Sequence, residues 1–90
     1  MKRILVVEDE DAIRSFVVVN LQRSGYIVVD AASGEQALTA YEQAGGDFDV
    51  VLLDITLPGI DGFEVCRRLR AKSATLGLIF LTARTQEMDK

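Results

Sequence analysis

Short, uninterrupted apolar runs alternate along this 90-residue sequence with longer segments of helical periodicity. The runs are Arg3 to Val7, Tyr26 to Ala31, Asp49 to Leu53 and Leu78 to Leu81. Continuous apolar runs are typical of strands covered on both faces, whereas half-exposed strands alternate apolar and polar residues. The intervals between the runs are too long for hairpins, so the pattern predicts parallel strands joined by helical crossovers. We therefore expect a doubly wound α/β fold with one parallel sheet.

Each interval between two runs predicts one helix. The first helix is expected over Asp11 to Ser24. The second begins after Ser33, with Gln36 in the position that completes a capping box, and Asp61 and Glu64 repeat this spacing before the third helix. The apolar residues expected to face inward on the three helices are Ile13, Phe16, Val17 and Leu21, then Ala37, Leu38, Tyr41 and Ala44, then Phe63, Cys66 and Leu69.

Two segments do not fit the simple alternation. Between Asp54 and the third helix, Pro58 and Gly59 predict a turn before any helix can start. Thr82 to Lys90 is expected to be a loop that leads into no more than the first turn of a fourth helix.

Composition narrows the classes of function. A net charge of −4 and a pI of about 4.6 give no positive surface for a phosphate backbone, so direct nucleic-acid binding is not expected. No apolar run approaches the roughly 18 residues of a membrane span, and the N-terminus lacks the apolar stretch of a signal peptide, so a cytoplasmic location is expected. The sequence has no histidine, which excludes the usual zinc ligands and histidine-activated nucleophiles. Cys66 is the only cysteine and is expected to be a small buried apolar residue.

The acidic residues gather where open parallel sheets bind their ligands, beyond the carboxyl ends of the strands. The first run leads into Glu8, Asp9, Glu10 and Asp11, and Asp54 directly follows the third run. If these two strands are neighbours, Glu8, Asp9 and Asp54 converge, and three carboxylates suit a hard cation such as Mg²⁺. Acids at a helix start also cap free N–H groups, which explains many such runs and is the role expected for Asp11.

Three stretches together carry a family resemblance. They are Ile4 to Glu10, Asp49 to Gly62 with Asp54 and Pro58 in place, and the ending Leu81, Thr82, Ala83. Over nearly the whole chain they resemble receiver domains of bacterial two-component signalling, most of all the receivers that precede winged-helix transcription factors. The resemblance implies a flavodoxin-like receiver fold and a signalling switch, not an enzyme.

The resemblance also implies roles for individual residues. Asp54 matches the phosphoacceptor, which receives its phosphoryl group from a sensor histidine kinase. Asp9 would bind Mg²⁺ or Mn²⁺ directly and Glu8 would bind it through water. The implied metal-binding set is Glu8, Asp9, Asp54 and the backbone carbonyl of Thr56. The hydroxyl of Thr82 would bond the phosphoryl group and move on activation, and Ala83 is small enough to leave the pocket open.

The sequence departs from the family pattern at its C-terminus. Residues 1–90 would form a C-terminally incomplete receiver domain without most of the fourth helix, the fifth strand and the fifth helix. The family's catalytic lysine has no counterpart, because Lys72 and Lys90 match neither its position nor its context. Weak or absent phosphorylation is therefore expected. The run Leu78 to Leu81 would form an open sheet edge, which favours a homodimer or a swapped assembly.

Hypotheses from other classes of function fit the sequence less well. Phosphatases of the haloacid dehalogenase type use a second aspartate two residues after the first, and here that position is Thr56. Dinucleotide-binding folds need a glycine-rich first turn, where this chain has acids from Glu8 to Asp11 that would repel a pyrophosphate. A receiver without phosphorylation competence that acts as an interaction or dimerisation module remains an open alternative.

Overall fold

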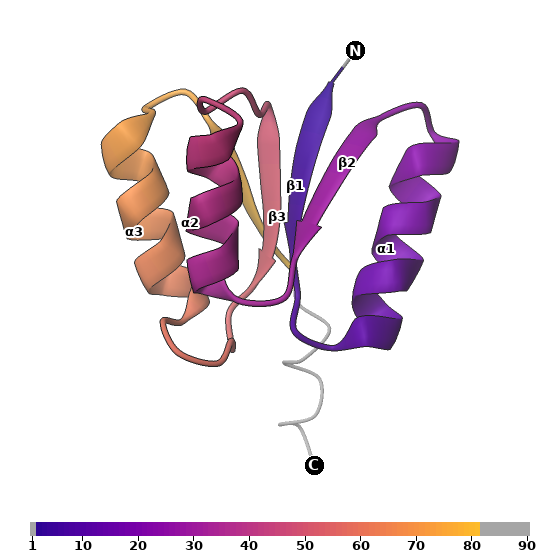
Figure 1. Cartoon of the computed structure of the whole chain (residues 1–90), viewed down its shortest axis with the longest axis horizontal. Helices are drawn as coiled ribbons and strands as arrows, with labels where there is room; N and C mark the ends of the chain where they lie inside the picture. Colours follow the sequence, from indigo (N-terminus) through magenta and orange to yellow (C-terminus); the bar gives the residue numbers. More distant parts are fainter. Residues whose placement is uncertain (1, 82–90) are drawn as a thin grey trace.

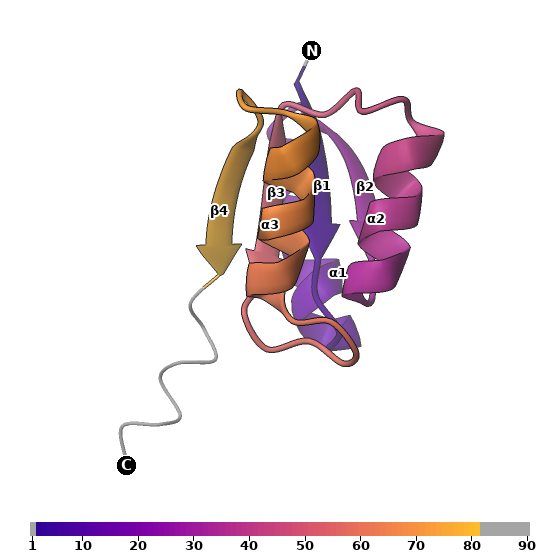
Figure 2. The same cartoon turned by 90° about the vertical axis from the view of Figure 1, so that its left-hand side faces the viewer.

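The computed structural model describes residues 2–81, which form a four-stranded parallel sheet between two layers of helix (Figure 1). In chain order the elements are β1 (Arg3–Val7), α1 (Asp11–Arg23), β2 (Ile27–Ala31), α2 (Gly34–Gln43), β3 (Val50–Asp54), α3 (Gly62–Lys72) and β4 (Gly77–Leu81). The strand order is β2-β1-β3-β4. α1 covers one face of the sheet, and α2 and α3 cover the other (Figures 1 and 2). The predicted α/β class and parallel sheet are confirmed.

Position in the sheet decides how far each strand is buried. In β1, which lies between two strands, every residue from Ile4 to Val7 is buried. β2 and β4 are edge strands among residues 2–81 and are mostly half-exposed. The prediction that strands are covered on both faces is therefore right for the centre of the sheet and too strong for its edges.

β1 has the predicted bounds, and the other three strands differ from the predicted runs by one residue. Pairing of β2 with β1 starts at Ile27, because the N–H of Tyr26 donates to the carbonyl of Leu21 at the end of α1, 3.2 Å away. β3 starts at Val50, and the carboxylate of Asp49 instead accepts a hydrogen bond of 2.8 Å from the N–H of Arg3. Asp54 is the last residue of β3, at the carboxyl end of the strand, where the sequence predicts it.

The main apolar core lies between the sheet and the layer of α2 and α3. Its fully buried members are Leu5, Val7, Ala37, Val51, Leu53, Val65 and Leu69. Both predicted caps that orient these helices are present. The hydroxyl of Ser33 accepts a hydrogen bond of 3.1 Å from the N–H of Gln36, and the carboxylate of Asp61 accepts one of 2.9 Å from the N–H of Glu64. α2 and α3 therefore start at defined residues near the carboxyl ends of the strands.

The inward faces predicted for α1 and α3 are partly wrong. Ile13, Val17 and Leu21 are half-buried, but Phe16 is 70% exposed, because α1 packs on β1 and β2 at one side of the sheet. In α3 the inward stripe consists of Gly62, Val65, Cys66 and Leu69. Phe63 lies next to this stripe, 59% exposed, with its ring centroid 5.2 Å from that of Phe80.

Two further sequence expectations are decided by local contacts. Asp11 is not the cap of α1: the cap residue is Glu10, without a side-chain cap bond, and the carboxylate of Asp11 instead accepts a bond of 2.7 Å from Arg14. Cys66 is half-buried against the core, and burial raises the pKa of its thiol. Among residues 2–81, no helix has the length and hydropathy needed to cross a bilayer. The loop predicted for Thr82 to Lys90 lies outside the described residues.

Candidate functional site

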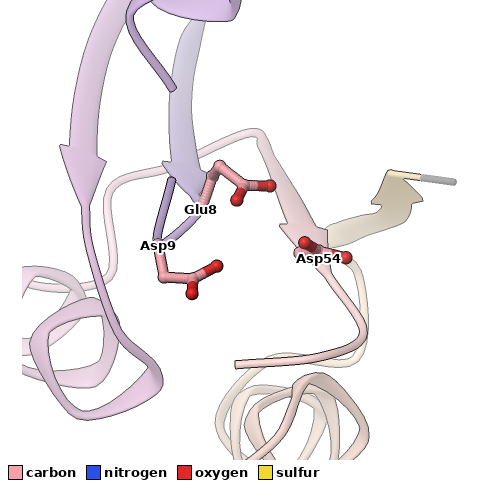
Figure 3. A group of neighbouring side chains, drawn as sticks. All are labelled: Glu8, Asp9 and Asp54. Atoms are coloured by element: carbon pink, nitrogen blue, oxygen red, sulfur yellow. The ribbon is translucent and has the colours of Figure 1, made fainter. Parts of the chain in front are cut away.

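The pairing of β1 with β3 brings the predicted acidic residues together. The register of the two strands places Val7 beside Leu53. The residues that follow these two, Glu8 and Asp54, therefore lie at the same edge of the sheet. Carboxylate oxygens of Glu8, Asp9 and Asp54 lie within 4.8 Å of one another. Figure 3 shows these side chains pointing toward one another from the ends of the two strands. The convergence predicted on condition that the two strands are neighbours is confirmed.

Burial makes this group different from an ordinary exposed acidic run. Glu8 and Asp54 are each only 1% exposed, and Asp9 is half-buried. The carboxylate of Glu8 accepts a hydrogen bond of 2.9 Å from the N–H of Glu10, which holds the chain in a turn directly after β1. Carboxylates taken out of water at such close range require compensating positive charge or hydrogen bonds.

The donor set therefore fits a hard divalent cation. Carboxylate oxygens are the preferred ligands of Mg²⁺ and Mn²⁺, and the described cluster contains no histidine or cysteine that would favour zinc. Glu8, Asp9 and Asp54 could hold such an ion. Of the other predicted site residues, Thr56 follows Asp54 in the β3–α3 loop and is exposed, whereas Thr82 and Ala83 lie outside the described residues.

The β3–α3 loop is folded tightly against the end of β3. The N–H of Gly62 donates to the carbonyl of Ile55 over 2.8 Å, which closes the loop on itself. The carboxylate of Glu35, in the first turn of α2, accepts a hydrogen bond of 3.2 Å from the N–H of Ile60. Contacts from both neighbouring helices thus fix the loop that carries Thr56.

Arg14 is a residue near the site that the sequence reasoning missed. Its guanidinium donates to the carbonyl of Glu8 at 2.8 Å, to the carboxylate of Asp11 at 2.7 Å and to that of Asp30 at 2.9 Å. Hydrogen bonding to Asp11, and then to Asp30, raises the pKa of Arg14 against the opposing effect of burial. The spacing of Asp11 and Arg14 within a helix could have indicated their ion pair. No sequence signal indicates the contacts with Glu8 and Asp30.

Comparison with known proteins decides the family. The family described as "Response regulator receiver domain" matches residues 4–90. The chain belongs to the response regulator receiver family. The fold and the acidic site agree with this assignment, and the resemblance inferred from the three sequence stretches is confirmed.

Two of the curated proteins that this receiver resembles are transcriptional regulators. It is 44% identical over 89 residues to the alkaline phosphatase synthesis transcriptional regulatory protein PhoP of Bacillus subtilis, covering 99% of this chain and 36% of that protein. It is 46% identical over 89 residues to the transcriptional regulatory protein AfsQ1 of Streptomyces coelicolor, covering 99% and 38%. The receiver chain therefore spans little more than a third of the length of these relatives.

Solved structures of receivers have the same fold. The response regulator TrrA of Thermotoga maritima in complex with Mg²⁺-BeF is 41% identical, with a TM-score of 0.83 over 99% of this chain and 76% of that chain. TrrA in complex with the histidine kinase ThkA gives 46% identity and a TM-score of 0.83 over 92% and 70%. The receiver domain of the hybrid histidine kinase CckA gives 34% identity and 0.79 over 98% and 99%.

Proposed function

We propose that this chain is the phosphoacceptor receiver of a two-component system, in which Asp54 accepts a phosphoryl group beside a bound Mg²⁺ or Mn²⁺. The metal-binding set would be Glu8, Asp9, Asp54 and the backbone carbonyl of Thr56. The observation that carries the proposal is the approach of three carboxylates within 4.8 Å at the ends of two adjacent strands, two of them buried. A buried group of this kind is expected where negative charge has a function.

Asp54 would act as the nucleophile. One of its carboxylate oxygens forms a bond to phosphorus while the bond from phosphorus to the donor breaks, and the bonding electron pair leaves with the donor. Mg²⁺ bound among the carboxylates would offset the repulsion between Asp54 and the approaching phosphoryl group. Glu8 and Asp9, held at the end of β1, would keep that ion beside Asp54.

A sensor histidine kinase is the phosphodonor that fits this chemistry. Its phosphohistidine would lose the phosphoryl group by cleavage of the phosphorus–nitrogen bond. The structural neighbour TrrA was solved in complex with a histidine kinase, where it is 46% identical over 92% of this chain, and this supports the same class of partner here. Such a receiver would work in the cytoplasm without binding nucleic acid itself, and its output would be transcriptional regulation, as in the curated relatives.

The modified chain would act as a switch and not as a turnover catalyst. The hydroxyl of Thr82 would bond the new phosphoryl oxygens, next to the small Ala83, and shift the balance between two arrangements of the surrounding loops. Thr56 stands where a phosphatase of the haloacid dehalogenase type needs its second aspartate. Only slow loss of the phosphoryl group to water is therefore expected.

The proposal is tested by intact-mass measurement after incubation with a small phosphodonor and Mg²⁺. A Mg²⁺-dependent phosphoryl adduct is expected on the native chain and not on Asp54→Asn. An adduct that persists in Asp54→Asn, or none with the native chain, would favour the alternative of an interaction module without phosphorylation competence.

Self-association through β4 is a second proposed property. Among residues 2–81, β4 pairs with β3 alone, so its outer edge presents backbone N–H and C=O groups to a further strand. Ile79 in the middle of this strand is 53% exposed. An edge with these properties favours pairing with a second copy, as a homodimer or a swapped assembly.

A further inference from the structure

Arg14 connects the three segments that meet behind the acidic site. It belongs to α1, it donates to the carbonyl of Glu8 at the end of β1, and it forms an ion pair with Asp30 in β2. A third bond joins it to Asp11 at the start of its own helix. The side chain is only 17% exposed, so its position is set by packing as well as by charge.

The bond to the carbonyl of Glu8 has a direct consequence for Asp9. A peptide group is planar, so holding the carbonyl of Glu8 also fixes the N–H and the Cα of Asp9. The N–H of Glu8 donates to the carbonyl of Ala31, and its carboxylate accepts from the N–H of Glu10. The N–H, the carboxylate and the carbonyl of Glu8 therefore each have a partner. Arg14 is the partner of the carbonyl, which belongs to the peptide group that joins Glu8 to Asp9.

We propose that Arg14 is a positioning residue for the cation site. It sets the direction of Glu8 and Asp9 without binding the ion. This inference rests on the proposed function, because it assumes that these carboxylates bind Mg²⁺. Groups that orient metal ligands through hydrogen bonds contribute to metal affinity even though they do not touch the metal. Arg14 does this through the main chain of Glu8.

Charge and geometry give opposite expectations for removing Arg14. The positive charge of a guanidinium makes the electrostatic potential at the nearby site less negative. A purely electrostatic role therefore predicts that Arg14→Gln binds Mg²⁺ more tightly. A positioning role predicts weaker binding, because Glu8 and Asp9 lose their fixed direction. The sign of the change therefore separates the two roles.

Lysine should replace arginine poorly at this position. Arg14 uses three different nitrogens, Nε, Nη1 and Nη2, for its three partners. A lysine ammonium is a single donor centre on a flexible stem and cannot reproduce this planar fork. Arg14→Lys keeps the positive charge and removes the geometry, and it is the more informative variant.

The test is a Mg²⁺ titration of the full chain, carried out on the native chain, Arg14→Gln and Arg14→Lys. Binding is monitored through the amide NMR signals of Glu8 to Asp11. Arg14→Gln is expected to raise the Kd for Mg²⁺ by about tenfold, and Arg14→Lys by a smaller factor that is still measurable. The matched control is Arg67→Gln, which removes an arginine paired with Glu64 on the surface of α3 and should leave the Kd unchanged.

A second readout needs no metal and covers the case in which Arg14→Gln does not fold. Hydrogen exchange at the amide of Glu10, which donates to Glu8, should be faster in Arg14→Lys than in the native chain. Asp30→Ala, which leaves Arg14 in place and removes one of its three acceptors, should show a smaller effect in the same direction.

An unchanged or lower Kd in Arg14→Lys would overturn the positioning role while leaving the proposed function intact. A native chain that binds no Mg²⁺ at these residues would instead remove the proposed function itself. The two failures are therefore distinguishable in a single set of titrations.

Discussion

Gly62 shows how little space the site leaves around Asp54. A Cβ on this residue would overlap the carbonyl oxygen of Asp54 and lie 2.9 Å from the Cα of Ile55. Both contacts are with backbone, which cannot move aside as a flexible side chain can. The small residue at the start of α3 is therefore required by close packing of two chain segments.

Gly62→Ala is accordingly expected to damage stability and site together. Forcing a methyl group into a filled space costs about 1–3 kcal/mol, which should appear as a lower urea midpoint of unfolding. The displaced carbonyl of Asp54 should also weaken Mg²⁺ binding. Gly45→Ala is the control: Gly45 has φ +66° and no atom near its missing Cβ, so it should lose stability through backbone strain alone. A native Mg²⁺ affinity in Gly62→Ala would contradict this account.

Single residues also mark the limit of what the sequence could predict. The caps by Ser33 and Asp61 follow from side chains that bond the nearby backbone, so sequence spacing was sufficient to identify them. Asp11 is a residue type that often caps helices, but its carboxylate accepts a hydrogen bond from Arg14 instead. A contact that depends on where a second side chain lies could not be obtained from spacing alone.

Among the elements, the helices illustrate the same limit. The sequence predicted the existence and order of α1, α2 and α3, because apolar periodicity is a strong local signal. It misplaced Phe16 and Phe63, since the side of a helix that is covered depends on neighbouring elements.

The outer face of α3 carries a charged cluster. The carboxylate of Glu64 accepts hydrogen bonds from Arg67 and Arg68, and these bonds lower the pKa of its carboxyl to about 2. This face of the helix therefore stays charged.

The edge strand β4 supports a prediction about assembly. At high concentration the chain should form dimers or larger assemblies in sedimentation experiments, because the β4 edge and Ile79 are exposed among the described residues. Ile79→Lys should shift the equilibrium toward monomer, since charge on an edge strand opposes pairing. Thr39→Lys, at an exposed position on α2, is the control for added charge. A monodisperse native monomer at high concentration would refute the proposal.

For the whole molecule, the decisive feature is the order of the strands. Placing β1 beside β3 brings residues separated by more than forty positions, Glu8 and Asp54, to the same rim of the sheet. The sequence could predict the parallel sheet and, once that order was assumed, the acidic cluster. It could not predict the packing of α1 that carries Arg14 to Glu8 and Asp30, because those contacts depend on the crossover geometry.

Carboxylates at the ends of β1 and β3 are proposed to share one cation, and a Mn²⁺ titration observed by NMR tests this sharing. A bound Mn²⁺ broadens the signals of nearby nuclei. Substoichiometric Mn²⁺ should therefore broaden the amide signals of Glu8 to Glu10 and of Asp54 to Thr56 together, and excess Mg²⁺ should restore them. Broadening at only one of these two segments, or spread evenly over the acidic surface, would contradict the account.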